Sequence, residues 1–140
     1  MRSTKQKSEY DRTEAHTALV DEVAKYLQED LGLYFWKNPS GKYNRDGKPI
    51  YYGRRGSADI IGCFRGFFVN IECKTGSGRL DYSQKKYKEA MEAEGGIYAA
   101  VRCWGDAKRL VACLRASLPS QRPLLLGYQP TPASFFRLAN

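Results

Sequence analysis

Two apolar runs separated by one tight turn constrain the fold of this 140-residue chain more than any other feature. The runs span residues 58–64 and 67–74, and Arg65-Gly66 stands between them. Runs of this length, rich in Ile, Val and Phe, predict two antiparallel strands, with Gly66 supplying the positive φ of the turn. In a two-residue turn, position 64 pairs with position 67, so position 59 falls opposite position 72.

This register divides the hairpin into an apolar face and a charged face. Directly opposed side chains lie about 4.5–5.5 Å apart at Cβ, so Asp59 and Glu72 are expected to meet on one face. Lys74 follows Glu72 by two residues and points to the same side. The side chains on the opposite face are predicted to form the core: Ala58, Ile60, Phe64, Phe67, Val69, Ile71 and Cys73.

A helix and a strand are predicted before the hairpin. Residues 11–31 have apolar side chains at spacings of three and four, the pattern of one helical face: Val20, Val23, Leu27 and Leu31. Gly32 ends the helix, and residues 33–36 predict a strand. Residues 38–49 are rich in turn residues and predict a loop or a long hairpin connection, followed by a short extended segment at 50–52.

A helix, a strand and a further helix are predicted after the hairpin. Asp81 and Gln84 predict a capping box for a helix at residues 82–94. Residues 97–103 predict a buried strand, and residues 106–118 a last helix whose first residue, an aspartate, caps it. A strand, a helix and a second strand in this order predict a parallel crossover.

The order of elements predicts an α/β fold, a single domain with a mixed β-sheet flanked by helices. We expect a disordered basic N-terminus at residues 1–10, the folded domain at 11–118, and a tail at 119–140 that packs on the core or on a dimer partner. No stretch approaches the roughly 18 apolar residues of a membrane span, and the first residues have no apolar signal core. The expected location is the cytoplasm.

The formal net charge of +8 is unevenly distributed. Residues 10–30 hold six acids and two bases, whereas bases gather in two later groups with tyrosines between them. The groups are Lys37, Lys42, Arg45, Lys48, Arg54 and Arg55, and Lys74, Arg79, Lys85, Lys86 and Lys88. Bases mixed with aromatic residues suit a polyphosphate with stackable bases, which predicts a nucleic acid. The alternative is a basic surface that only keeps the protein soluble.

The cysteines and the single histidine indicate no zinc site. No two cysteines lie within the spacing of a zinc-binding pair, and all four fall in apolar runs that predict burial: Cys63, Cys73, Cys103 and Cys113. A catalytic cysteine–histidine pair would have to use His16, and no motif supports it.

Paired carboxylates on the charged face predict a divalent cation. Asp59 and Glu72 at such a distance repel unless a positive charge lies between them, and hard oxygen ligands suit Mg²⁺. A cation, its water and the nearby ammonium of Lys74 are the parts needed for phosphodiester hydrolysis. The alternative is a surface salt bridge between Glu72 and Lys74.

These residues resemble a known nuclease signature. Gly56-Ser57-Ala58-Asp59, followed after thirteen residues by Glu72-Cys73-Lys74, is similar to the PD-(D/E)xK pattern. Three further features resemble its VRR-NUC branch: the segment from Thr75 to Gln84, the Gly95-Gly96 pair, and Val101-Arg102. The resemblance covers about residues 11–117. The chain departs from it at Cys103, where the name-giving motif has a second arginine.

The resemblance implies a restriction-endonuclease-like core and a Mg²⁺- or Mn²⁺-dependent DNA endonuclease. Asp59 and Glu72 match the metal ligands, and the carbonyl of Cys73 matches a main-chain ligand. Lys74 matches the lysine that orients or activates the attacking water, and Gln84 matches a glutamine that reaches toward the site.

Glu14 matches the acidic residue of the family's first helix, which completes the metal shell. On a helical wheel, however, Glu14 lies opposite the apolar stripe, on the face of a solvated acid. Glu9 and Glu22 are the alternatives for this role.

The same resemblance implies a substrate class. Small free-standing members resemble homodimeric endonucleases that resolve four-way DNA junctions, and a two-fold dimer offers the two sites that such a junction requires. We expect phosphate contacts from basic residues near the site: Lys42, Arg54, Arg55, Lys85, Lys86 and Lys88. The alternatives are a restriction-like or nicking nuclease on duplex DNA and a non-catalytic nucleic-acid-binding protein.

Overall fold

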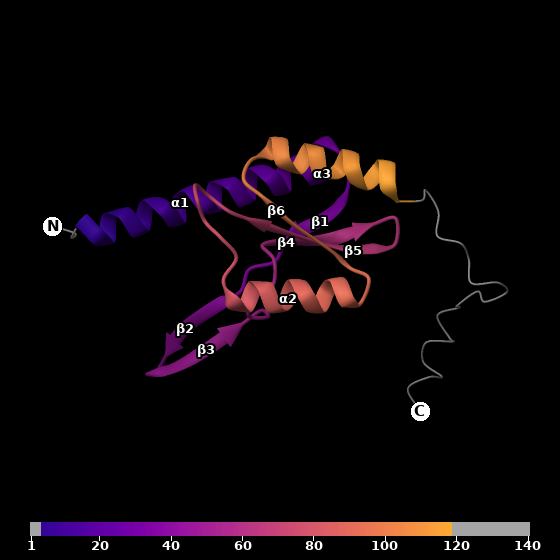
Figure 1. Cartoon of the computed structure of the whole chain (residues 1–140). Helices are drawn as coiled ribbons and strands as arrows, with labels where there is room; N and C mark the ends of the chain where they lie inside the picture. The colour runs from indigo at the N-terminus through magenta and orange to yellow at the C-terminus, as the bar shows by residue number, and fades with distance from the viewer. Residues whose placement is uncertain (1–3, 119–140) are drawn as a thin grey trace, which may run out of the picture.

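The computed structural model describes residues 4–118, with side chains from residue 13 onward. Within this range the chain forms a four-stranded mixed sheet, a separate two-stranded hairpin and three α-helices. Figure 1 shows α1 and α3 over one face of the larger sheet and α2 over the other. The predicted single α/β domain, with a mixed sheet flanked by helices, is therefore confirmed.

The larger sheet has the strand order β1-β4-β5-β6. These strands are Tyr34–Lys37, Ile60–Phe64, Phe67–Cys73 and Ile97–Val101. β4 and β5 are antiparallel with Phe64 opposite Phe67, the register expected for a two-residue turn. Arg65 and Gly66 both have positive φ, as a tight hairpin turn requires. β5 and β6 are parallel, as predicted for strands joined through a helix.

Helix α1 is longer than predicted. It spans Thr4–Lys25 and continues as a π-helical turn at Tyr26–Asp30, whereas the sequence predicts a helix at 11–31 preceded by a disordered segment. The early start is hard to predict because residues 4–10 contain almost no apolar side chains to mark a helical face. The predicted apolar stripe is confirmed, since Val23 and Leu27 are completely buried.

The two later helices begin close to their predicted positions. α2 spans Tyr82–Ala93, and Asp81 and Gln84 form the predicted capping box. α3 spans Trp104–Ser117. Its N-cap residue is Cys103, so the prediction that Asp106 caps this helix is wrong. Asp106 lies in the first turn, where its carboxylate accepts a hydrogen bond from the backbone N–H of Arg102.

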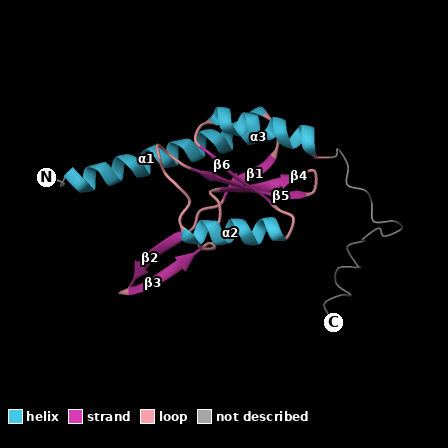
Figure 2. Cartoon of the chain, in the orientation of Figure 1, coloured by secondary structure: helices cyan, strands magenta, loops and turns pink. Residues whose placement is uncertain are grey.

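Residues 38–52 form a hairpin rather than a loop. β2 at Gly41–Arg45 and β3 at Lys48–Tyr52 pair only with each other. Figure 2 shows this hairpin apart from the larger sheet, beyond the beginning of α2. The prediction of a loop or a long hairpin connection at 38–49 is therefore wrong for residues 41–45 and 48–49, which form strands. The extended segment expected at 50–52 is part of β3.

Most of the core lies between the larger sheet and the helices α1 and α3. It contains the predicted hairpin residues Ile60, Phe64, Val69, Ile71 and Cys73. A smaller cluster of Ala58, Tyr87 and Tyr98 lies under α2. Burial of apolar area, at about 25 cal/mol per Å², makes the larger cluster the main source of stability.

Three of the four cysteines are exposed, which corrects the prediction that all are buried. Cys73 is buried, whereas Cys63, Cys103 and Cys113 are exposed. Cys63 lies opposite Tyr34 on β1, and the helix on that side, α2, packs mainly on β6. An apolar stretch of sequence therefore does not ensure burial where no helix covers the sheet.

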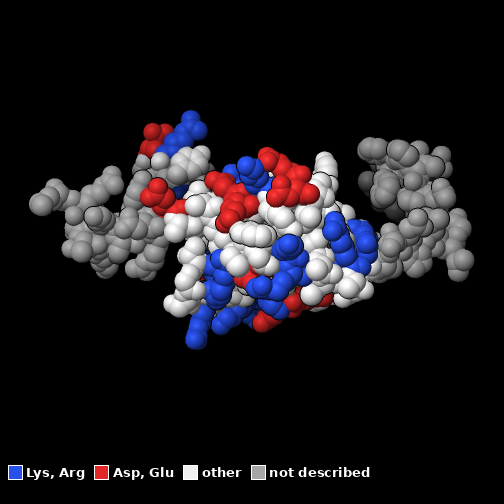
Figure 3. Space-filling view, turned by 90° about the horizontal axis from the view of Figure 1, so that it is seen from above, with Lys and Arg blue, Asp and Glu red and all other residues white. Residues whose placement is uncertain are grey.

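Charge is segregated on the surface. Figure 3 shows, from above, acidic side chains mainly along one edge of this face and basic side chains mainly along the other. No helix among the described residues is both long enough and apolar enough to cross a membrane. The predicted tail at 119–140, with its proposed packing role, lies outside the described residues.

Candidate active site

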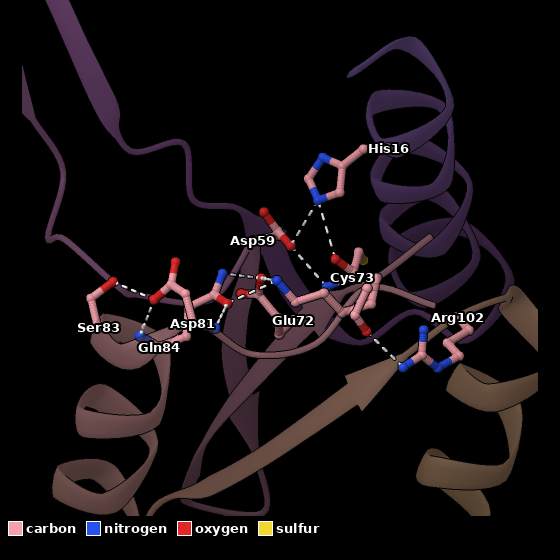
Figure 4. A network of polar contacts seen from close by, with 10 residues as sticks. His16, Asp59, Glu72, Cys73, Asp81, Ser83, Gln84 and Arg102 are labelled. Atoms are coloured by element: carbon pink, nitrogen blue, oxygen red, sulfur yellow. Dashed lines mark hydrogen bonds and ion pairs between the residues drawn. The ribbon is translucent and has the colours of Figure 1, made fainter. Parts of the chain in front are cut away.

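The candidate site lies at the end of the larger sheet where β4 begins and β5 ends. Asp59 immediately precedes β4, Glu72 is near the end of β5, and Lys74 follows that strand. Figure 4 shows Asp59 and Glu72 between α1, which carries His16, and the start of α2, which carries Gln84. The predicted convergence of Asp59, Glu72 and Lys74 is thus found, and Gln84 joins them.

Glu72, Lys74 and Gln84 form one closed set of polar contacts. Lys74 Nζ lies 3.0 Å from Glu72 Oε1 and donates to Gln84 Oε1 over 2.8 Å. Gln84 Nε2 donates to the same Glu72 oxygen over 2.5 Å. Gln84 also has the predicted capping role, because its Oε1 accepts the backbone N–H of Asp81. The two predicted roles of this glutamine therefore coexist.

The carboxylate of Glu72 is the most unusual polar group of the site. Only 2% of its surface is exposed, and its Oε2 atom is buried without a hydrogen-bond partner among the described residues. Burial, followed by the nearby charge of Asp59, raises the pKa of Glu72 to about 7, although Lys74 acts in the opposite direction. A buried carboxylate with one unpaired oxygen can accept a positively charged ligand.

Asp59 is held by the backbone of the neighbouring strand. Its Oδ2 atom accepts the backbone N–H of Cys73 over 2.8 Å. His16 Nε2 lies 3.3 Å from that oxygen and 3.2 Å from the carbonyl oxygen of Cys73. Because both neighbours are hydrogen-bond acceptors, we assign the ring hydrogen to Nε2 in this arrangement.

His16, and not Glu14, reaches the site from α1. The Glu14 side chain is exposed and has no hydrogen bond or ion pair within the described part of the chain. Glu22 is also exposed, and the side chain of Glu9 lies outside the described residues. His16 precedes Val20 by four residues and Val23 by seven, so it lies on the buried face of the helix. That spacing was the available sequence signal.

Two further contacts fix the backbone around the site. Asn38 donates to the hydroxyl of Ser57 and to the carbonyl of Ala58, and its own N–H bonds the carbonyl of Asp59. Gly56 has φ +80° and its missing Cβ would lie 2.3 Å from the carbonyl oxygen of Ser83. Only glycine fits there, so this residue lets the loop before Asp59 touch the start of α2.

Arg102 holds the loop that follows Lys74. Its guanidinium donates to the carbonyl oxygens of Gly76 and Gly78 over 2.6 and 2.8 Å. The N–H of Lys74 bonds the carbonyl of Val101, which extends the pairing of β5 and β6. The arginine of the Val101-Arg102 motif therefore positions the backbone next to the site and does not contact the carboxylates.

A cleft of about 870 Å³ opens over the site. Of the predicted phosphate-contact residues, Lys42 and Arg55 line this cleft, together with Asp59, Glu72 and Lys74. The α2 lysines are placed differently. Lys86 and Lys88 lie outside the lining and form ion pairs along α2 with Glu89 and Glu92, while Arg54 and Lys85 are exposed and also lie outside it.

The donor atoms are of the types that bind a hard divalent cation, but they are not close enough together to coordinate one in this structure. Oxygen donors are available from Asp59, from the orphaned Oε2 of Glu72 and from the carbonyl of Cys73, the donor types that Mg²⁺ and Mn²⁺ prefer. Among the described residues, no three acidic, histidine or cysteine side chains are gathered closely enough to hold an ion as they stand. His16 Nε2 occupies the space between Asp59 and the Cys73 carbonyl.

The site combines two carboxylates, an ammonium group held in place and a cleft lined in part by basic side chains. Asp59 and Glu72 offer carboxylate oxygens, Lys74 offers a positive charge held in place by Gln84, and the cleft above them is partly lined by basic residues. These are the groups that can bind a phosphodiester and a cation together. Comparison with protein-family models and with curated proteins finds no match for this chain.

Proposed function

We propose that this protein is a Mg²⁺- or Mn²⁺-dependent endonuclease that hydrolyses DNA phosphodiester bonds. The observation that carries the proposal is the buried carboxylate of Glu72, whose Oε2 has no partner within residues 13–118. It lies beside Lys74 and below a cleft lined by Lys42 and Arg55. A purely structural salt bridge leaves this carboxylate oxygen without a role, whereas a cation site uses it.

Asp59, Glu72 and the Cys73 carbonyl would hold the cation, with His16 as a nitrogen donor once Nε2 is free of its hydrogen. Such a cation lowers the pKa of water and offsets the charge of the phosphoryl transition state. Lys74 holds a positive charge where the phosphate oxygens gain negative charge. Gln84 fixes that ammonium by accepting its hydrogen bond. Arg55 and Lys42 bind flanking phosphates and position the strand.

The fold and substrate proposals extend the same resemblance. We infer a restriction-endonuclease-like core of the PD-(D/E)xK type, supported by the antiparallel β4–β5 pair that brings Asp59 and Glu72 to one end of the sheet. We infer a branched substrate, with the four-way junction first, and a homodimer that presents two sites. The compartment inferred is the cytoplasm.

Cleavage of a substrate panel tests the proposal. The full-length protein is incubated with a four-way junction, a flap and a linear duplex of the same sequence, with Mg²⁺, Mn²⁺ or EDTA. We expect cleavage only with a divalent cation, and fastest on the junction. Equal cleavage of the three substrates would establish a restriction-like or nicking enzyme instead. Binding with no cleavage under any metal condition would leave only a nucleic-acid-binding protein.

The His16→Ala variant tests which α1 residue belongs to the site. We expect cleavage to fall about 10–100-fold, with a higher Mg²⁺ concentration needed for half-maximal rate, because His16 contacts two of the expected metal-binding groups. The matched variant Glu14→Ala removes an exposed side chain two residues away, and we expect its rate to stay within about twofold of the parent. Faster cleavage by His16→Ala at low Mg²⁺ would show that this imidazole only blocks the cation.

A further inference from the structure

The β2–β3 hairpin is an arm beside the cleft. Its turn residues Asp46 and Gly47 both have positive φ, 51° and 74°, which is the geometry of a type I′ turn matched to strand twist. Its strands pair only with each other, so the hairpin has no place in the larger sheet. Figures 1 and 2 show it extending away from the body of the domain, past the start of α2.

The arm carries three exposed tyrosines. Tyr51 is 71% exposed, Tyr43 is 50% exposed and Tyr52 is 46% exposed. Tyr43 and Tyr52 lie on one face with ring centroids 6.3 Å apart, while Tyr51 lies on the other face opposite Lys42. Exposed aromatic rings on a hairpin outside the core add nothing to core packing, and their flat faces remain open to a ligand.

The bases of the arm have no charged partner within the described part of the chain. Lys42, Arg45 and Lys48 have no ion pair or hydrogen bond from their side chains within residues 13–118. Some bases elsewhere are paired: Lys37 contacts Asp21, and Lys88 contacts Glu92. Three unneutralised bases next to three exposed aromatic rings complement a ligand that carries both phosphates and flat bases.

The arm is continuous with the candidate site. One cleft is lined both by Lys42, Tyr51 and Tyr52 of the arm and by Asp59 and Glu72 of the candidate site. Gly41 pairs with Tyr52 within the arm, and a Cβ on it would lie 2.8 Å from the hydroxyl of Tyr52, so this glycine leaves room for the tyrosine ring. A strand lying in the cleft would meet Tyr51, Tyr52 and the carboxylates together.

We propose that the β2–β3 hairpin binds an unpaired DNA strand and leads it into the cleft, with bases stacked on Tyr51 and Tyr52, which both line the cleft, and phosphates on Lys42 and, farther along the arm, on Arg45 and Lys48. The proposal rests on the proposed nuclease function and names the part of a branched substrate that the arm recognises. Stacking requires open base faces. A duplex hides these faces between neighbouring pairs, so the arm favours an unpaired strand over a closed duplex.

Binding without cleavage tests the arm directly. The full-length protein is titrated in EDTA against a fluorescein-labelled oligothymidylate of about 15 nucleotides, an abasic strand of the same length and a duplex. We expect Tyr51→Ala to weaken oligothymidylate binding about 5–100-fold and to change duplex and abasic-strand binding less than about twofold. Tyr51→Trp keeps a stacking surface and is expected to bind at least as tightly as the parent.

Tyr34→Ala is the matched control. Tyr34 is 79% exposed on β1 and lies outside the cleft lining, so its loss removes an equal ring without touching the arm. We expect its binding to be unchanged and the melting temperatures of both variants to equal that of the parent. Unchanged oligothymidylate binding by Tyr51→Ala, or equal losses on all three ligands, would overturn the proposal. Metal-dependent cleavage of the panel, measured separately, would still decide the nuclease function.

Discussion

The Lys74→Met variant is expected to cleave DNA about a thousandfold more slowly than the parent at saturating Mg²⁺. Lys74 Nζ is fixed between Glu72 Oε1 and Gln84 Oε1 at 3.0 and 2.8 Å, so its charge is already oriented before substrate binds. A preorganised charge is worth most where charge develops in the transition state. Single-turnover rates with the junction substrate measure the effect, because they exclude product release.

Lys88→Met is the control for this variant. Lys88 lies on α2, is paired with Glu92 and lies outside the cleft lining, so the same loss of charge should change the rate less than about twofold. Lys74→Arg keeps the charge but changes its shape and reach, and we expect it to recover only part of the rate. If Lys74→Met cleaves as fast as the parent, the proposed mechanism is wrong, even if the protein remains a nuclease.

Local sequence patterns predicted much of this fold because the chain is locally consistent. The β4–β5 register followed from the two-residue turn, and the start of α2 followed from Asp81 and Gln84. The start of α1 did not follow, because residues 4–10 lack the apolar spacing that marks a helix face. The π-helical turn at Tyr26–Asp30 has no sequence signature of this kind.

The sequence predicted the strand residues of the candidate site better than the helix residue that contacts them. Asp59, Glu72 and Lys74 were predictable because strand pairing fixes which side chains share a face. His16 was not predicted at the site, although its spacing from Val20 and Val23 places it on the buried face of α1. Its contact with Asp59 spans 43 positions of sequence and depends on how α1 packs on the sheet.

Side-chain environment was the least predictable property. Cys63 was expected in the core, yet α2 leaves that side of β4 uncovered. Lys86 and Lys88, which stay predicted phosphate contacts, pair with acids one helical turn away, and their basic run did not indicate this pairing. Apolar or basic composition gives a tendency, whereas the neighbouring element decides exposure and pairing.

Replacing Glu72 by glutamine is expected to abolish cleavage while stabilising the metal-free protein at about pH 8. Glu72 has a pKa of about 7 in the folded protein against 4.5 for an ordinary glutamate. Between these values the folded chain binds a proton that the unfolded chain has released, so the free energy of unfolding falls as pH rises through this window. The shift amounts to at most about 3 kcal/mol.

The Glu72→Gln variant removes the free-energy cost of burying a charged carboxylate and keeps a side chain of the same size in the site. Its amide oxygen can still accept from Lys74 and Gln84, and its nitrogen takes the place of an oxygen that already lacks a partner. We expect the melting temperature in EDTA at about pH 8 to rise by about 5–10 °C and its decline between about pH 5 and 8 to disappear. Glu92→Gln, an exposed glutamate on α2, is the control and should change it little.

Adding Mg²⁺ should reverse the order of the two proteins. A cation that binds only the folded parent raises its melting temperature in proportion to the logarithm of the cation concentration, whereas the glutamine variant lacks the charged ligand and should respond weakly. A variant that melts below the parent in EDTA would show that the attraction between Glu72 and Lys74 exceeds the cost of burial. In that case Glu72 would be a structural ion-pair partner. Its burial would not destabilise the metal-free protein, and this destabilisation is the property expected of a cation ligand.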